Sequence, residues 1–136
     1  MALADAGIEH VVLTMAEARC ANPAAIHKTL VAEVDDRPVV AVVRLDGRLS
    51  LKALARAAGA KRAAMIEPRD AERLTGYVTG GISPFGQRRP LATYLDAGAM
   101  SYERIYVSAG QRGLEVGVAP RALVALLGAT VAPLGA

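Results

Sequence analysis

Few side chains in this sequence of 136 residues could carry out catalysis. There are two histidines, His10 and His27, and one cysteine, Cys20. A zinc site needs about four ligands at short spacings, whereas these three residues lie 10 and 7 positions apart. Neither a nucleotide-binding fingerprint nor a serine-hydrolase elbow is present. We therefore expect no metal and no cofactor, and we interpret Cys20 as a small buried residue of a helix rather than as a nucleophile.

The most informative stretch for chemistry is rich in glycine. Gly80 and Gly81 remove two consecutive side chains, so a ligand can approach the backbone closely. Pro84 fixes one dihedral angle and favours an extended backbone at Ser83, which follows Ile82. Such a loop can present free amides to a carbonyl or phosphate oxygen. The alternative is a plain tight turn, which the glycines alone favour.

Basic residues near this loop and near the first apolar run could hold a phosphate. Lys28 directly precedes Thr29, where a β-branched and apolar run begins. A lysine in such a place is usually solvated, but it can also hold a phosphate or a polarised carbonyl. Arg88 and Arg89 follow the glycine-rich loop, and they either contact RNA phosphates or lie in a solvated turn.

Two further polar residues flank a predicted turn late in the chain. Gly110 and Gly113 indicate a hairpin, and Ser108 and Glu115 lie on either side of it. The hairpin would bring these two side chains close together. The pattern leaves open whether they face a pocket.

Local patterns predict the elements that position these residues. Thr14 and Glu17 form a capping box, which starts a short helix before Pro23. Ser50 and Gly59 have the positions of an N-cap and a C-terminal glycine in a second helix. The predicted helices after the first cover residues 51–58, 68–74 and 120–127, and the predicted strands cover residues 29–34, 38–45, 63–66, 91–95, 104–108, 114–118 and 129–131.

These elements predict an α+β fold. Hairpin connections outnumber long helical crossovers, which favours a mixed, largely antiparallel sheet with helices packed on it over a doubly wound parallel sheet. The length fits one domain, residues 1–136. With 53% apolar and 4% aromatic residues, the core must be mainly aliphatic.

Composition and charge narrow the location and the partners. No apolar run approaches the roughly 18–20 residues of a membrane helix, and the start of the chain does not resemble a secretory signal. A single cysteine suits a reducing cytoplasm. The net charge of +3 permits a polyanionic partner without requiring one. We expect a cytoplasmic protein without membrane contact.

Three segments in this order resemble a known family. They are HKTL at residues 27–30, TGYVTGGISPFGQ at residues 75–87 and IYVSAGQRGLE at residues 105–115. Together they are similar to the YbaK/EbsC family of bacterial aminoacyl-tRNA deacylases, which are relatives of the editing domain of bacterial prolyl-tRNA synthetases. The resemblance covers residues 14–134. It implies hydrolysis of mischarged tRNA in trans, on a mixed sheet that closes into a partial barrel surrounded by helices.

The resemblance also implies which residues form the site. The family's essential lysine falls on Lys28, which we expect to hold the 3′-terminal adenosine or its phosphate. Backbone amides of Gly80, Gly81 and Ile82 are expected to hold the substrate carbonyl. The expected substrate-binding residues are Thr29, Ser83, Pro84, Ser108 and Glu115, and weaker tRNA contacts are expected from Arg88 and Arg89.

One position departs from the family pattern. Glu115 stands where the family usually has an aspartate, and its additional methylene group moves the carboxylate.

The loop sequence GGISPFGQ is similar to the branch that acts on Cys-tRNA(Pro). In that branch the thiol of the substrate attacks the ester, so the enzyme supplies positioning and oxyanion stabilisation. The expected partner is aminoacyl-tRNA rather than DNA, with prolyl-tRNA synthetase as a second candidate partner. Two alternatives stay open: specificity for alanine, serine or threonine, and a non-catalytic module that binds tRNA or a synthetase.

Overall fold

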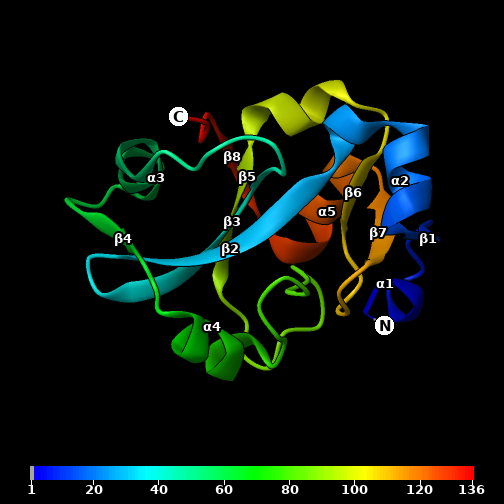
Figure 1. Cartoon of the computed structure of the whole chain (residues 1–136). Coiled ribbons are helices and arrows are strands. Elements are labelled where there is room, and N and C mark those ends of the chain that lie inside the picture. The colour runs from blue at the N-terminus through cyan, green and yellow to red at the C-terminus, as the bar shows by residue number, and fades with distance from the viewer. Residues whose placement is uncertain (1) are drawn as a thin grey trace.

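The computed structural model describes residues 2–136, whose strands form two sheets (Figure 1). A three-stranded sheet has the order β1-β7-β6, and a five-stranded sheet has the order β4-β2-β3-β5-β8. The strands are β1 (Val11–Thr14), β2 (His27–Val34), β3 (Arg37–Arg44), β4 (Ala63–Met65), β5 (Ala92–Asp96), β6 (Ile105–Ser108), β7 (Leu114–Val118) and β8 (Thr130–Ala132). The helices are α1 (Ala2–Asp5), α2 (Met15–Ala21), α3 (Leu51–Ala58), α4 (Pro68–Thr75) and α5 (Pro120–Leu127), with 3-10 helices η1 (Pro23–Ala25) and η2 (Ala97–Ser101).

Most strand pairs are antiparallel, which confirms the predicted α+β class and pairing. The parallel pairs are β3-β5 and β5-β8. A parallel bridge between Ile26 and Tyr106 joins the start of β2 to β6, and thus one sheet to the other. The prediction had a single sheet, whereas the structure has two. The described strands do not close into a barrel, so the partial barrel stays a prediction.

The elements predicted from local patterns are present, with ends that shift by one or two residues. The structure adds three elements that the sequence patterns did not predict, namely α1, β1 and η2. Each of them is five residues long or shorter. Such short segments hold too few residues to show a hydrophobic period.

The β2–β3 hairpin holds the start of β2 in place. Its two-residue turn places Asp35 and Asp36 in the left-handed region, with φ angles of 46° and 67°, as a primed hairpin turn requires. The carboxylate of Asp35 accepts hydrogen bonds from the amides of Lys61 and Arg62 at 3.0–3.1 Å. These bonds tie the turn to the segment before β4 and so stabilise the pairing of β2 with both neighbours.

Helix α2 begins at the predicted capping box. The Thr14 hydroxyl accepts a hydrogen bond from the Glu17 amide at 3.1 Å, and the Glu17 carboxylate accepts one from the Thr14 amide at 2.8 Å. Cys20 lies in this helix as predicted, but its side chain is exposed. The prediction of a buried cysteine is therefore wrong, because Ala18 is the residue that α2 buries against the sheet.

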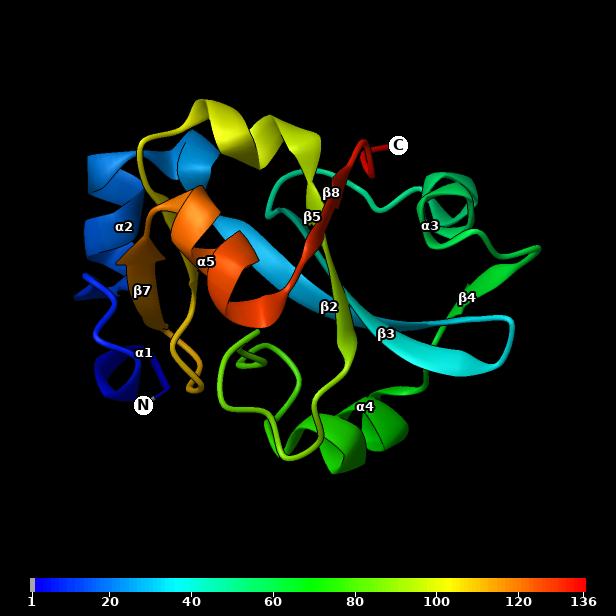
Figure 2. The same cartoon turned by 180° about the vertical axis from the view of Figure 1, so that it is seen from behind.

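The main hydrophobic core lies between the two sheets, where α5 also packs (Figures 1 and 2). It is mainly aliphatic, as expected, and Phe85 of the glycine-rich loop is fully buried in it. The loop is therefore anchored in the core at one end. The fully buried aliphatic residues of this cluster include Val40, Val42, Leu95, Ile105, Val107, Val116 and Leu123.

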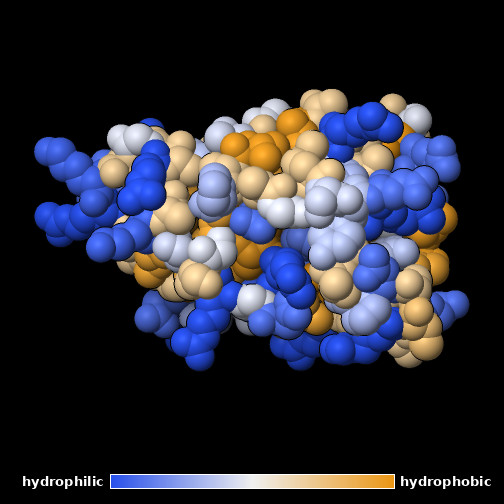
Figure 3. Space-filling model, turned by 90° about the horizontal axis from the view of Figure 1, so that it is seen from above, coloured by the Kyte–Doolittle hydropathy of each residue, from blue (hydrophilic) through white to orange (hydrophobic). Residues whose placement is uncertain are grey.

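The surface is polar at one end of the molecule. Figure 3 shows hydrophilic side chains gathered over the end that carries α3 and the β2–β3 turn. Within residues 2–136, no helix is both long and apolar enough to cross a membrane.

Candidate active site

A pocket of about 340 Å³ opens where the start of β2, the glycine-rich loop and the β6–β7 hairpin meet. Its walls are mostly apolar, and a few polar groups converge on it, as is typical of small-ligand sites. The pocket is lined by Met15, His27, Lys28, Thr29, Leu30, Val31, Leu45, Met65, Ile66, Pro68, Ala71, Thr79, Gly80, Ile82, Ser108 and Glu115.

Lys28 lies half-buried at the edge of this pocket. Its ammonium group donates a hydrogen bond to the carbonyl of Gly47 at 2.7 Å. That contact links β2 to the turn after β3 and directs the lysine side chain. Since an ammonium group has three N–H donors, two remain for a ligand in the pocket.

Two buried polar atoms in the pocket wall have no hydrogen-bond partner among the described residues. They are Nε2 of His27 and Oγ1 of Thr29. Nδ1 of His27 lies 2.7 Å from the carbonyl of Ala25 and must donate to it, so Nε2 of the neutral ring is an acceptor. Burial lowers the pKa of His27, which favours this neutral form. Because unpartnered buried polar atoms are costly, the pair points to a ligand that brings hydrogen-bond donors.

The glycine-rich loop packs directly on the β6–β7 hairpin. A Cβ atom at Gly81 would lie 3.0 Å from the backbone nitrogen of Arg112 and 3.1 Å from the backbone carbon of Gln111. The Arg112 side chain donates in turn to the carbonyl of Thr79 at 2.8 Å. The absence of a side chain at Gly81 therefore allows two backbones to touch, which places the loop beside the pocket.

The backbone amides of this loop differ in whether they are free to bind a ligand. The Gly81 amide donates to the carbonyl of Val78 at 2.9 Å, so it is already used within the loop. The amides of Gly80 and Ile82 donate to no other described residue, and both residues line the pocket. Of the three amides expected to hold a carbonyl, those of Gly80 and Ile82 are therefore free in the structure, and that of Gly81 is not.

Ser108 and Glu115 lie side by side, as the hairpin predicted. They are directly paired across the antiparallel strands β6 and β7, and both line the pocket. The Ser108 hydroxyl accepts a hydrogen bond from the Gly110 amide at 3.2 Å. Glu115 is only 4% exposed, and burial raises the pKa of its carboxyl from 4.5 to about 7, although Arg19 partly opposes this.

Protonation of Glu115 should make stability depend on pH. Because the pKa of Glu115 is higher in the folded protein, the folded state binds more protons between pH 4.5 and about 7. The free energy of unfolding should therefore fall as the pH rises through this window, by up to about 3 kcal/mol. Glu115→Gln should remove this fall, which urea denaturation at pH 5 and pH 8 would measure. Glu67→Gln, at an exposed position, is the control, and an equal fall in all three proteins would contradict the assignment.

Not every residue predicted for the site reaches the pocket. Ser83 and Pro84 are buried beside it, and the Ser83 hydroxyl accepts from the Phe85 amide at 3.2 Å, within the loop itself. Arg88 and Arg89 are exposed and lie outside the pocket wall.

His27 lines the pocket but was not among the residues predicted for the site. His27 lies two residues before Thr29, so both side chains lie on one face of β2. This spacing could have indicated His27 from the sequence. The apolar wall from Met65, Ile66 and Ala71 comes from β4, α4 and the segment between them, and it follows from tertiary packing alone. Among the described residues, no three His, Cys, Asp or Glu side chains are grouped as metal ligands.

Comparisons with known proteins show the family of this chain. A family model for the aminoacyl-tRNA editing domain matches residues 9–126. EbsC of Enterococcus faecalis, a proposed Cys-tRNA(Pro)/Cys-tRNA(Cys) deacylase, is 44% identical over 102 residues, which are 74% of this chain and 62% of EbsC. The chain thus spans less than two thirds of the length of that relative.

Two solved structures share the whole fold. A proposed trans-editing enzyme for prolyl tRNA synthetase has a TM-score of 0.86 at 27% identity, covering 99% of this chain and 92% of that chain. The hypothetical protein APE2540 has a TM-score of 0.87 at 25% identity, covering 98% of this chain and 96% of that chain. With a family match over residues 9–126, the chain belongs to the aminoacyl-tRNA editing domain family.

Proposed function

We propose that this protein hydrolyses the ester bond of mischarged tRNA in trans, with Cys-tRNA(Pro) as its substrate. The observation that carries the proposal is that Lys28, the Ser108–Glu115 pair, and Gly80 and Ile82, whose amides are free, all line one pocket. The family supports the reaction class. The activity proposed for EbsC supports the choice of cysteine.

The pocket residues suit catalysis by positioning. The Gly80 and Ile82 amides are aimed at the ester carbonyl, where they stabilise the oxyanion that forms during attack. The free N–H donors of Lys28 hold the terminal adenosine or its phosphate. Thr29 and neutral His27 accept hydrogen bonds from the ammonium or hydroxyl groups of the substrate. Ser108 and Glu115 complete this polar side of the pocket.

The nucleophile comes from the substrate in this mechanism. The cysteine sulfur attacks the ester carbonyl, a C–S bond forms, and the C–O bond to the ribose breaks. The thiol proton passes to the ribose oxygen, and water then opens the released thiolactone to free cysteine. The side chains of the protein need only hold the reacting atoms together, and orientation of this kind can lower a barrier by several kcal/mol.

The apolar wall favours cysteine over serine. Leu30, Val31 and Ile66 supply hydrocarbon surface, against which a thiol behaves as a small apolar group. A seryl hydroxyl on this wall would lose its hydrogen bonds to water, at a cost of about 1–3 kcal/mol. The serine hydroxyl is also the poorer nucleophile.

A deacylation panel tests both the reaction and the substrate. We expect the protein to hydrolyse Cys-tRNA(Pro) and to spare Ser-tRNA(Pro) and Ala-tRNA(Pro), measured as loss of labelled amino acid from tRNA. Alanine has no side-chain nucleophile, so hydrolysis of Ala-tRNA(Pro) at the same rate would refute thiol assistance. Hydrolysis of Ser-tRNA(Pro) alone would move the specificity to serine, and hydrolysis of none would indicate a binding module.

The size of the substrate suggests help from a second protein. A net charge of +3 gives modest, salt-sensitive attraction to tRNA, although Arg88 and Arg89 add exposed cations near the loop. We propose that prolyl-tRNA synthetase is the partner that holds the body of the tRNA, that the reaction takes place in the cytoplasm, and that residues 1–136 act as one editing domain. The partial barrel that the family resemblance implies is part of the same proposal.

A further inference from the structure

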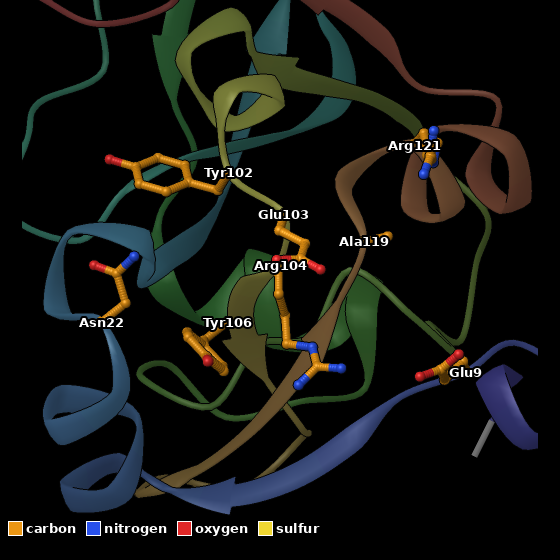
Figure 4. A pocket seen from close by; sticks show the side chains of 8 residues that line it. All are labelled: Glu9, Asn22, Tyr102, Glu103, Arg104, Tyr106, Ala119 and Arg121. Atoms are coloured by element: carbon orange, nitrogen blue, oxygen red, sulfur yellow. The ribbon is translucent and has the colours of Figure 1, made fainter.

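A second cavity, of about 470 Å³, lies beside the three-stranded sheet (Figure 4). It is bounded by the segment after η2, the start of α5, the end of α2 and the segment before β1. Figure 4 shows Tyr102 and Tyr106 on one side, Arg121 on the other, and Arg104 between them. The full lining is Glu9, Asn22, Tyr102, Glu103, Arg104, Tyr106, Ala119 and Arg121.

Three donors that line this cavity have no partner among the described residues. Tyr106 is 7% exposed and lines the cavity, and its hydroxyl makes no hydrogen bond to another described residue. Neither Arg104 nor Arg121 takes part in an ion pair there, since the two ion pairs of the described residues lie elsewhere. Arg104 is half-buried and Arg121 is exposed, so both guanidinium groups and the Tyr106 hydroxyl are available to an acceptor ligand in the cavity.

Gly117 gives the cavity its shape. A Cβ atom at this position would lie 2.8 Å from both the Cδ atom of Arg104 and the Cε1 atom of Tyr106. The missing side chain lets the arginine stem and the phenol ring lie flat against β7. Both side chains line the cavity.

Helix α5 adds a fixed positive end to the same cavity. The helix begins at Pro120, and its N-cap residue Ala119 provides no side-chain hydrogen bond. Ala119 and Arg121 both line the cavity. Pro120 has no N–H, and the amides of Ala122 and Leu123 donate to the Ala119 carbonyl, so the Arg121 amide is the free donor of this first turn. Together with the arginine side chain and the positive end of the helix dipole, it favours an anion beside Tyr106.

The cavity adjoins the candidate active site. The ring of His27, which lines the first pocket, makes an edge-on contact with the ring of Tyr102, with centroids 6.3 Å apart. Tyr106 and Ser108 point to the same face of β6 two residues apart, which is about 7 Å. One nucleotide of extended RNA spans such a distance.

We propose that this cavity binds the nucleotide that precedes the terminal adenosine of the tRNA substrate. This inference rests on the proposed function. The phosphodiester contacts Arg104, Arg121 and the start of α5, and the base stacks on Tyr102, as bases of single-stranded RNA stack on aromatic side chains. The Tyr106 hydroxyl donates to a phosphate or ribose oxygen.

The charges of the cavity fit a single phosphodiester better than a polyphosphate. Arg104 and Arg121 supply two positive charges, and Glu9 and Glu103 supply two negative ones, so the formal sum is zero. A nucleoside di- or triphosphate would meet repulsion from both carboxylates. A cytosine, in contrast, offers its exocyclic amino group to a carboxylate.

Two substrates of different length test this subsite. We expect Arg121→Ala and Arg104→Ala to raise KM for Cys-tRNA(Pro) about tenfold with unchanged kcat, the loss expected for one good contact. Neither variant should change KM for cysteinyl-adenosine, which lacks the preceding nucleotide. Arg56→Ala, at an exposed position of α3, removes the same charge outside the cavity and should change KM for neither substrate.

The outcomes separate the subsite from the proposed function. An unchanged KM for Cys-tRNA(Pro) in both variants would overturn the subsite, and so would an equal rise with both substrates. If the wild type hydrolyses neither substrate, the proposed function fails. Binding of uncharged tRNA(Pro) then tests the subsite separately. The subsite stands if Arg121→Ala weakens that binding about tenfold relative to Arg56→Ala, and it falls if the two variants bind equally.

Discussion

Replacement of Lys28 by alanine should lower kcat/KM for Cys-tRNA(Pro) by at least about 100-fold, the loss typical for one preorganised charged donor. The ammonium group is fixed by its 2.7 Å hydrogen bond to Gly47, so the folded protein holds it in place before the substrate arrives. A donor that needs no reorganisation contributes most at the transition state. Initial rates of deacylation for the wild type and the variant measure the effect.

The variant should keep its fold. Lys28 is half-buried near the start of the long strand β2, and the ion pairs of the described residues do not include it. Loss of the bond to Gly47 should cost only about 1 kcal/mol, which thermal unfolding would show as a small shift of Tm. Lys52→Ala, at an exposed position of α3, is the matched control. Deacylation by Lys28→Ala at the wild-type rate would remove Lys28 from the mechanism.

Sequence patterns predicted the elements well wherever a local signal acts through the backbone. The Thr14–Glu17 capping box and the Ser50 and Gly59 caps of α3 are all present. These signals are local because each links atoms within a few residues of one another. The arrangement of two sheets was not predictable in this way, since the bridge that joins them pairs Ile26 with Tyr106, 80 positions apart in the sequence.

The same distinction holds for the candidate site. The order of the motifs indicated Lys28, the loop and the hairpin, and the structure places their pocket-lining members together. Residue types alone did not show which loop amides are free. The Gly81 amide is not free, because it donates to the carbonyl of Val78 within the loop. The apolar wall and the second cavity depend on how sheets and helices pack. Neither has a pattern in the sequence.

Replacement of Gly81 by alanine should reduce activity about 10- to 100-fold and destabilise the fold by about 1–3 kcal/mol, as overpacking does. The new methyl group would lie 3.0 Å from the backbone nitrogen of Arg112. A backbone atom cannot rotate away as a flexible side chain can, so the loop must move off the hairpin. That shift displaces the amides of Gly80 and Ile82 from the pocket, where a change of about 1 Å is enough to slow a positioned reaction strongly.

The effect should come from this contact rather than from backbone strain. The φ angle of Gly81 is not positive, whereas that of Gly80 is 88°. Gly135→Ala is the control, because a Cβ atom there meets no atom within 4 Å and its φ is also not positive. Deacylation rates and urea denaturation of both variants decide the matter. Equal, small effects of the two substitutions would show that close packing of the loop on the hairpin does not position the amides, and the oxyanion role of Gly80 and Ile82 would lose its structural basis.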